Sequence, residues 1–470
     1  MENYNVKRKA SLMDRYIAWF EKWMPESLFI CFILTLLIAF LAIILTDAPI
    51  IGSDVTKGII DGWAAGFWGL LAFTMQMTVL LATGSAVASS PPAKKALSKL
   101  AQIPKTRTQF FLVGAITAGL FGYIHWGLGM MVAIVFGREL LAQAKKNGIK
   151  IHAPLFVATL FFGFLPAAAG ISGAAVLYAA TPGYLKSLVP DIYMQATPDA
   201  VTLAESVFNL QFILLLLICM FVPVLFAKIS HPKDESKIIE LNEEIYKEIL
   251  SSQESIYIPR KTPSEKANGA RWIMYLIGGI IFGYSVIKLV NNGIMGLDLN
   301  SFNFLSLGLG MLLCANWGPE YYGKLFKQGV IDSYGFIIQF PFYAGIFGII
   351  SSTGLGIVIS HAFTSISTTT TWPIIAYIYS ALLNIAVPSG GSKFIIEAPY
   401  IIPTSLDLGV NIGKVLQAYQ MGDATTNLII PFFALPYLSN FKLKFNQIVA
   451  YTVPCVGIVI LLTISYLLIF

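Results

Sequence analysis

The sequence predicts an all-α polytopic membrane protein with inverted structural repeats, two re-entrant helical hairpins and discontinuous helices. Hydrophobic residues make up 56% of the 470 residues and charged residues only 12%. Apolar runs long enough to cross a bilayer alternate with short charged loops. Glycine- and proline-rich interruptions recur in corresponding places of the two halves, a pattern typical of secondary transporters. The mean hydropathy of +0.72 excludes the soluble classes.

The charges and cysteines give information on topology rather than on a ligand. The net charge of +6 is spread over the loops between apolar runs, so it does not indicate a nucleic-acid partner. All cysteines lie in apolar segments without paired spacing, and we expect small buried hydrophobic residues rather than disulfides or metal ligands. They are Cys31, Cys219, Cys314 and Cys455.

The first apolar run, Ser27–Thr46, is long enough to span a bilayer and lacks a small-residue cleavage pattern after it. We therefore expect a first transmembrane helix with a cytoplasmic N-terminus, not a signal peptide. A second span over Gly66–Ser89 returns the chain to the inside. The strongest basic cluster follows there, as the positive-inside rule requires: Lys94, Lys95, Lys99, Lys105 and Arg107.

The run Gln109–Phe136 lies between that cluster and a second basic loop, Arg138–Lys150. Because basic loops flank it on both sides, the run is predicted to enter and leave on one face. This is the first expected hairpin, with its tip at His125–Gly129. A further broken element, Pro154–Pro182, and a span over Val207–Ala227 complete the first half, residues 1–227.

The polar stretch Lys228–Arg271 is expected to be a cytoplasmic linker with a helical piece around Ile238–Leu250. A connecting span, Trp272–Val290, opens the second part, residues 272–470. There Gly329–Gly345 resembles Gly58–Met77, and one offset aligns His125 with Asn384 and Gly163 with Gly422. Counting spans places the second copy in the opposite orientation, so the halves are predicted to be inverted repeats.

The run Ala386–Pro403 is the second expected hairpin. It is too apolar for a surface loop, and its glycines and prolines break any single spanning helix. In hydrocarbon such backbone is tolerated only where protein buries it or a watery cavity meets it. A helix that restarts after Gly390–Gly391 would offer free N–H groups and a positive dipole end to a carboxylate.

We expect the two tips, the break at the centre of Pro154–Pro182 and nearby polar residues to line a substrate site. The candidate substrate-binding residues are His125, Trp126, Gly127, Gly129, Ser172, Gly173, Gln339, Asn384, Ser389, Gly390, Gly391, Ser392 and Lys393. Lys393 stands four residues before Glu397, so a salt pair that only joins hairpin to scaffold is an equal alternative. A lone histidine such as His125 is more often simply hydrogen-bonded than functional.

An ionisable residue deep in an apolar run is costly and indicates function. Asp423 is such a residue, within Val415–Leu438, and Thr426 and Asn427 place further hard oxygens beside it. We expect these three residues to carry ion coupling, by binding a proton or a sodium ion. The alternative is that Asp423 only pairs with Lys393. No other cofactor or metal is expected.

Other chemistries lack their motifs. The sequence contains no G-x-x-x-x-G-K-[ST] loop for ATP and no G-x-S-x-G elbow, and its four histidines show no metal-ligand spacing. The chain is therefore not expected to be an enzyme. A channel would need a continuous polar pore, and charged residues are scarce in the spans. The leading function is a secondary carrier for an anion, moved by a proton or sodium gradient.

Five motifs resemble one family. They are GFWGLLAFTMQM (Gly66–Met77), GSAVASS (Gly84–Ser90), AATPG (Ala179–Gly183), QFPFYAGI (Gln339–Ile346) and NIAVPSGG (Asn384–Gly391). Together they are similar to bacterial short-chain fatty acid transporters linked to acetoacetate and butyrate uptake. The resemblance implies a small monocarboxylate substrate and a place in the bacterial inner membrane. The run MGDATTNLIIP also resembles dicarboxylate and amino-acid carriers, and the oligomeric state, a homodimer included, stays open.

Overall fold

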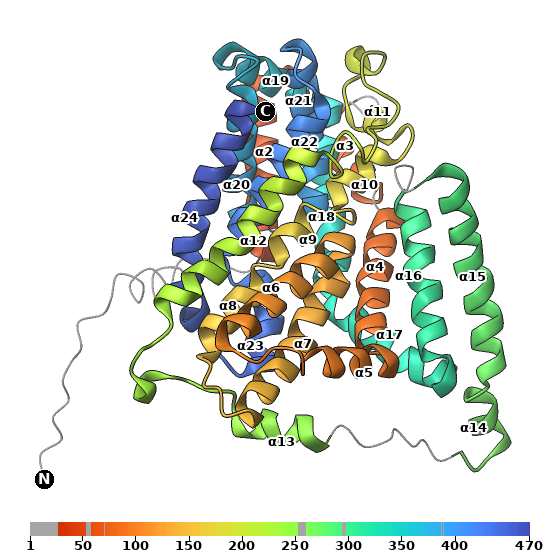
Figure 1. Ribbon diagram of the computed structural model, residues 1–470. Coiled ribbons are helices and arrows are strands. Elements are labelled where there is room, and N and C mark those ends of the chain that lie inside the picture. The colour runs from red at the N-terminus through yellow and green to blue at the C-terminus, as the bar shows by residue number, and fades with distance from the viewer. Residues whose placement is uncertain are drawn as a thin grey trace, which may run out of the picture.

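The computed structural model describes residues 27–52, 58–69, 71–251, 260–293, 298–386, 388 and 390–470, and all regular structure in these ranges is helical (Figure 1). The predicted all-α architecture is confirmed. Within these ranges, five helices are long and apolar enough to cross a membrane, and a pair bent by 80° at Gly354 would make a sixth. The N-terminal segment and Ser389 lie outside the described residues.

The helices of the first half follow the predicted spans. Their bounds are α2 Ser27–Leu45, α3 Ile59–Phe67, α4 Leu71–Ser89, α5 Pro91–Leu100, α6 Arg107–Ile124, α7 Trp126–Lys146, α8 Ala153–Phe161, α9 Phe164–Ala168, α10 Ala174–Ala180, α11 Tyr184–Leu188, η1 Asp191–Tyr193 and α12 Leu210–Ser230. A capping box begins α6, because Thr106 Oγ1 accepts from the Gln109 N–H while Gln109 Oε1 accepts from the Thr106 N–H.

The span expected over Gly66–Ser89 is mainly α4, and a separate helix, α3, precedes it and ends at Phe67. The two pieces have different partners. A Cβ on Gly66 would lie 2.5 Å from the Ala344 carbonyl oxygen and 2.8 Å from Gly348 Cα, so α3 packs closely on a helix of the second half. In contrast, α4 packs against α16 and α17. The two helices therefore have separate packing partners.

The linker and second half contain the remaining elements. They are η2 Glu235–Lys237, α13 Glu243–Ser251, α14 Pro263–Asn268, α15 Arg271–Asn292, α16 Leu299–Cys314, η4 Ala315–Trp317, α17 Pro319–Asp332, α18 Tyr334–Thr353, α19 Leu355–Ile366, α20 Trp372–Ala386, α21 Gly390–Asp407, α22 Ile412–Asn427, η5 Phe432–Ala434, α23 Leu435–Phe441 and α24 Phe445–Ile469. Helix α16 was not predicted from the sequence. Asp298 is its N-cap residue, and Asp298 Oδ1 accepts a hydrogen bond from the Ser301 N–H.

Two helix pairs each turn back within the molecule. The start of α6 lies beside the loop after α7, because Arg107 Nε donates to the Lys150 carbonyl oxygen at 3.1 Å. Likewise the start of α20 lies beside the end of α21, where Thr369 Oγ1 donates to the Leu408 carbonyl oxygen at 3.1 Å. In Figure 1 the α6–α7 pair occupies the lower half and the α20–α21 pair the upper half. The two pairs thus point toward each other from opposite ends.

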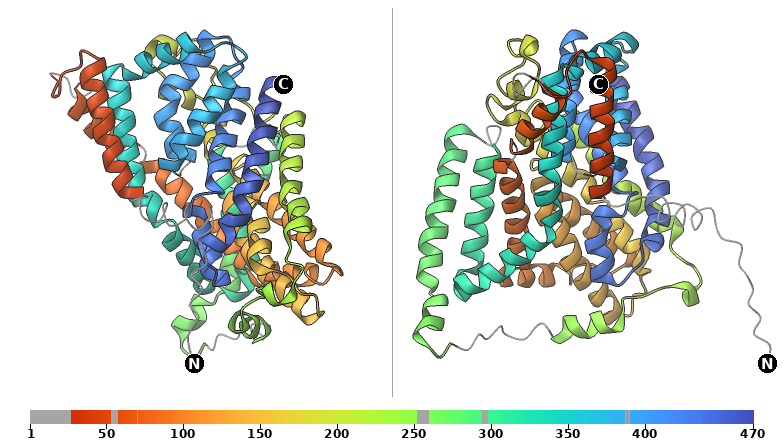
Figure 2. Two further views of the ribbon diagram at one scale, coloured as in Figure 1. Left: turned by 90° about the vertical axis from the view of Figure 1, so that its left-hand side faces the viewer. Right: turned by 180° about the vertical axis from the view of Figure 1, so that it is seen from behind.

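The two halves pack on each other reciprocally. From the first half, α2 and α3 lie against α18; from the second, α16 and α17 lie against α4. The rear view in Figure 2 shows α2 and α18 side by side. Exchanging α2 with α16, α3 with α17 and α4 with α18 turns one set of contacts into the other.

The linker lies across one face of the molecule. Its helix was expected around Ile238–Leu250 and is α13. Acidic residues of the linker form ion pairs with basic residues from both halves: Glu235 with Lys150 at 2.7 Å, Glu248 with Arg138 at 2.6 Å, Glu243 with Lys145, and Glu244 with Lys442. The loops after α7 and after α23 therefore share this face. The cysteines are free and buried, as predicted.

Candidate functional site

A cavity of about 60 Å³ lies where the broken segments meet. Its walls are Met77, Trp126, Phe164, Ala167, Ala168, Gly173, Ala174, Phe340, Gly390, Gly391, Asp423 and Phe433. Trp126 comes from the first predicted tip, Gly390 and Gly391 from the second, and Gly173 from the break between α9 and α10. These four predicted site residues and Asp423 therefore line the same cavity.

The start of α21 forms one wall of this cavity. The first amides of a helix have no partner within it, and the helix dipole adds partial positive charge at this end. Gly390, the first residue of α21, allows a close approach: a Cβ there would lie 3.1 Å from Asp423 Oδ2. Tyr419 fixes the break from α22, because its hydroxyl donates to the Gly390 carbonyl oxygen at 2.7 Å.

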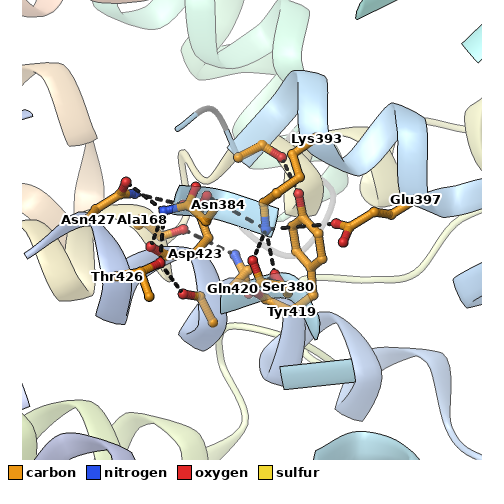
Figure 3. A network of polar contacts seen from close by, with 12 residues as sticks. Ala168, Ser380, Asn384, Lys393, Glu397, Tyr419, Gln420, Asp423, Thr426 and Asn427 are labelled. Carbon is orange, nitrogen blue, oxygen red and sulfur yellow. Dashed lines mark hydrogen bonds and ion pairs between the residues drawn. The ribbon is translucent and has the colours of Figure 1, made fainter. Parts of the chain in front are cut away.

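A buried charge cluster lies behind this wall (Figure 3). Lys393 Nζ lies 3.7 Å from Glu397 Oε2 and 3.9 Å from Asp423 Oδ1. Its ammonium also donates to the Ser380 carbonyl oxygen at 3.2 Å and lies 4.0 Å from the centroid of the Tyr419 ring. Lys393 and Glu397 are fully buried and Asp423 is 5% exposed. One buried cation is therefore shared by two carboxylates, of which Asp423 also lines the cavity.

The three predicted ion-coupling residues lie together, and the side-chain amide of Asn384 donates hydrogen bonds to all three. Asn384 Nδ2 donates to Thr426 Oγ1 at 3.0 Å, to Asn427 Oδ1 at 2.8 Å and to the Asp423 carbonyl oxygen at 3.1 Å. Asn427 Nδ2 in turn donates to Asp423 Oδ2 at 3.2 Å. These hydrogen bonds join α20 to α22, while Asp423 Oδ1 and Asn384 Oδ1 have no hydrogen-bond partner.

At the first tip, polar groups satisfy the broken backbone. His125 has an extended conformation, and its Nδ1 accepts from the Leu128 N–H at 3.2 Å. Ser172 Oγ accepts from the Trp126 N–H at 2.7 Å and so ties this tip to the break after α9. Both residues position Trp126 against the cavity, although neither lines it.

Other candidate residues lie outside the cavity wall. A Cβ on Gly129 would lie 2.2 Å from Gly122 Cα, and one on Gly127 would lie 2.9 Å from Leu81 Cδ1, so these glycines allow α6, α7 and α4 to pack closely. Gln339 is partly exposed, whereas its neighbour Phe340 lines the cavity. Ser389 lies outside the described residues, as does the Ser392 side chain.

Tyr419 and Ser380, which contact Lys393, are site residues that were not predicted from the sequence. Both stand four residues before a candidate: Tyr419 before Asp423 on α22, and Ser380 before Asn384 on α20. Residues at this spacing share a helix face. That periodicity could have identified them, but an apolar run offers many such pairs, and only the packing of α20 on α22 selects these two.

Comparisons with known proteins agree with this architecture. A sequence profile of the short chain fatty acid transporter family matches residues 9–470. A candidate short-chain fatty acid transporter of Escherichia coli (strain K12) is 30% identical over 95% of this chain and 96% of its own. A Haemophilus influenzae protein of the same description is 29% identical over 95% of this chain and 96% of its own.

Two solved transporters share the fold. The Alcanivorax borkumensis YdaH transporter, described as having an unusual topology, superimposes with a TM-score of 0.58 at 15% identity, over 94% of this chain and 96% of its own. Neisseria gonorrhoeae MtrF, which represents a class of antimetabolite efflux pumps, gives 0.57 at 17% identity, over 97% of both chains. The protein is therefore a multi-pass membrane transporter, and it belongs to the short-chain fatty acid transporter family.

Proposed function

We propose that the protein is a secondary active transporter that carries short-chain monocarboxylates, such as butyrate or acetoacetate, across the bacterial inner membrane, coupled to a proton or sodium gradient. The observation that supports this most is the cavity at the start of α21, which combines a helix N-terminus with apolar walls. A carboxylate would take the N–H groups of the first turn. A short acyl chain would lie against side chains such as Phe164, Phe340 and Phe433.

The lining favours a monocarboxylate over a C4-dicarboxylate. Among the described residues that line the cavity, none is a lysine, arginine or histidine. The nearby Lys393 lies behind the wall and is engaged by Glu397, Asp423 and Ser380. A second carboxylate would therefore meet aromatic and aliphatic surface, at a high cost in desolvation.

The transport cycle that we propose uses two re-entrant hairpins, α6–α7 and α20–α21, in two inverted halves, residues 1–227 and 272–470, joined by the cytoplasmic linker 228–271. The reciprocal packing of the halves supports this arrangement. So does the offset that aligns His125 with Asn384, because it also aligns the N-cap residues His152 and Asn411. Basic loops at the face of the linker support a cytoplasmic location for that face, and we propose a cytoplasmic N-terminus as well.

Uptake into proteoliposomes tests the proposal. Purified protein would be supplied with labelled butyrate, acetoacetate or succinate under separately imposed proton and sodium gradients. We expect saturable, gradient-dependent uptake of butyrate and acetoacetate, with succinate poorly accepted. Preferential uptake of succinate would assign a dicarboxylate carrier instead, and flux that never saturates would assign a channel.

A further inference from the structure

The Glu397 carboxylate is buried with a single source of charge compensation. It is fully buried, and neither of its oxygens has a hydrogen-bond partner within 3.5 Å, because the nearby Tyr419 hydroxyl donates to the Gly390 carbonyl oxygen instead. The nearest cation is Lys393, at 3.7 Å from Oε2. A buried ionised carboxylate without hydrogen bonds is strongly unfavourable unless a cation lies beside it. The charge state of Glu397 therefore depends on where Lys393 is.

Lys393 has a competing partner that faces the cavity. Asp423 Oδ1 lies 3.9 Å from the ammonium, and Asp423 lines the cavity whereas Lys393 and Glu397 do not. A substrate carboxylate bound at Gly390 and Gly391 would lie next to Asp423. Two adjacent carboxylates cannot both stay ionised unless a cation stabilises them. An arriving anion therefore draws Lys393 toward Asp423 and away from Glu397.

We propose that Glu397 is the proton carrier of the transport cycle, taking up one proton for each substrate carboxylate that enters the cavity. The inference rests on the proposed function, since it assigns the coupling step of that same site. When the substrate binds, Lys393 pairs with Asp423 and the substrate, and Glu397, left without its cation, binds a proton from water on the loading side. When the substrate leaves, Lys393 returns and Glu397 releases that proton to the other side.

The exchange keeps the buried charge constant. Before loading, the cluster holds one ammonium and two carboxylates; after loading, it holds one ammonium, the Asp423 carboxylate, the substrate carboxylate and a neutral Glu397. The net charge is one negative unit in both states, and the dipole of α21 partly offsets it. Loading without the proton would add a second negative charge in a low-dielectric site, which is far more costly.

The other titratable side chains near Glu397 are mainly tyrosines. Tyr400 lies on its own helix, Tyr419 on α22 and Tyr379 on α20, and Tyr379 and Tyr400 are joined by a hydrogen bond of 2.9 Å between their hydroxyls. The other helices packed on α21 contribute Tyr178 on α10, Tyr184 and Lys186 on α11, Tyr343 on α18 and the exposed His361 on α19, and Lys186 is paired with Asp199 at 3.2 Å. Tyrosines stay neutral at physiological pH, so the cluster's charge is set by Lys393, Glu397 and Asp423.

A proton needs fewer ligands in this cluster than a sodium ion, which needs several oxygens at once. Thr426 Oγ1 and Asn427 Oδ1 accept from Asn384, and Asp423 Oδ2 accepts from Asn427, whereas Asp423 Oδ1, Asn384 Oδ1 and Gln420 Oε1 have no hydrogen-bond partner. A proton needs only one carboxylate oxygen, and both oxygens of Glu397 are without hydrogen bonds.

Glu397→Gln tests this assignment in proteoliposomes with labelled butyrate, using Glu320→Gln at an exposed ion pair of α17 as the control. A one-to-one proton symporter uses a pH gradient to drive uptake, and because neutral butyric acid also crosses the bilayer unaided, the readout is the initial rate above that of protein-free liposomes. We expect gradient-driven uptake above this background in the parent and the control, and none in Glu397→Gln. Exchange of internal for external butyrate should persist in Glu397→Gln, because glutamine mimics the neutral, loaded form and exchange moves no net proton.

Two results would overturn the inference. One is gradient-driven uptake by Glu397→Gln that matches the parent; the other is loss of exchange in a variant that purifies as a folded, monodisperse protein. If the variant does not fold, a pH dye trapped in liposomes with the parent decides: one proton should enter with each butyrate, and sodium-driven uptake without proton entry refutes the role. A parent that exchanges no short-chain carboxylate would instead refute the proposed function.

Discussion

Gly390 and Asp423 approach each other so closely that a Cβ on Gly390 would lie 3.1 Å from Asp423 Oδ2. This contact joins the first residue of α21 to the only acidic side chain among the described residues that line the cavity. The positive end of a helix and a carboxylate thus share one wall. The next predictions depend on this pairing.

Gly390→Ala should displace the Asp423 carboxylate, because a methyl group at this distance forces its neighbour to move. We expect weaker butyrate binding, measured as a higher KM for uptake, with the protein still folded. Gly283→Ala in α15 is the matched control, since a Cβ there meets nothing within 4 Å. Equal KM values for the two variants would show that the contact has no part in binding.

Asp423→Asn should abolish accumulation driven by a gradient while the protein stays folded. Asparagine keeps the shape and can still bond Asn427, but it no longer competes for Lys393, so Glu397 stays ionised through the whole cycle. Uptake assays at imposed gradients measure this. Unchanged gradient dependence in the variant would refute the role of Asp423.

Lys393→Ala should both weaken substrate binding and destabilise the protein. It removes the cation from two buried carboxylates, and breaking a buried ion pair from one side costs about 3 to 5 kcal/mol. Thermal unfolding in detergent measures the loss, which should be larger at high pH, where the orphaned carboxylates are forced to ionise. If butyrate affinity and melting temperature both stay at the parent values, the lysine contributes to neither.

The contact between the linker and α8 should weaken in acid. His152 Nδ1 accepts from the Ile239 N–H at 3.1 Å, and the Ala153 N–H donates to the Ile239 carbonyl oxygen at 2.7 Å. Burial, and to a lesser extent His231, lower the pKa of His152 from 6.5 to about 4. Since the docked form binds the proton less well, docking is at full strength above pH 6.5 and is lost as the pH falls toward 4.

Hydrogen exchange at the Ile239 amide, corrected for the intrinsic rate, checks this prediction. Protection should decline over that pH interval in the parent and be absent at every pH in His152→Ala. His361→Ala, on the exposed face of α19, is the control and should leave protection unchanged. Protection in the parent that does not vary with pH would contradict the role of His152.

The spans and breaks could be predicted because they follow from local composition. Apolar length defined α2, α12 and α15, and the clusters of glycine and proline marked the interruption at His125 and the start of a new helix at Gly390. The separate helix α3 before α4 could not be predicted from the sequence, because it depends on contacts with α18, which lies far along the chain. Nor was α16 predicted, because asparagines and serines interrupt its apolar face.

The site was predicted in part for the same reason. Trp126, Gly173, Gly390, Gly391 and Asp423 are next to breaks or are charges at membrane depth, and they line the cavity. Gly129 carried the same signal but serves packing against Gly122, and Gln339 points elsewhere while Phe340 lines the wall. The sequence shows where a helix is interrupted, but which residues pack against each interruption depends on the tertiary structure.

The most direct measurement is the position of a brominated substrate analogue. In a crystal of the protein soaked with 4-bromobutyrate, anomalous scattering would locate the bromine. The account predicts a single peak in the cavity between Trp126 and Phe340, with the carboxylate at the start of α21. A peak elsewhere, in a protein that still transports the analogue, would contradict it.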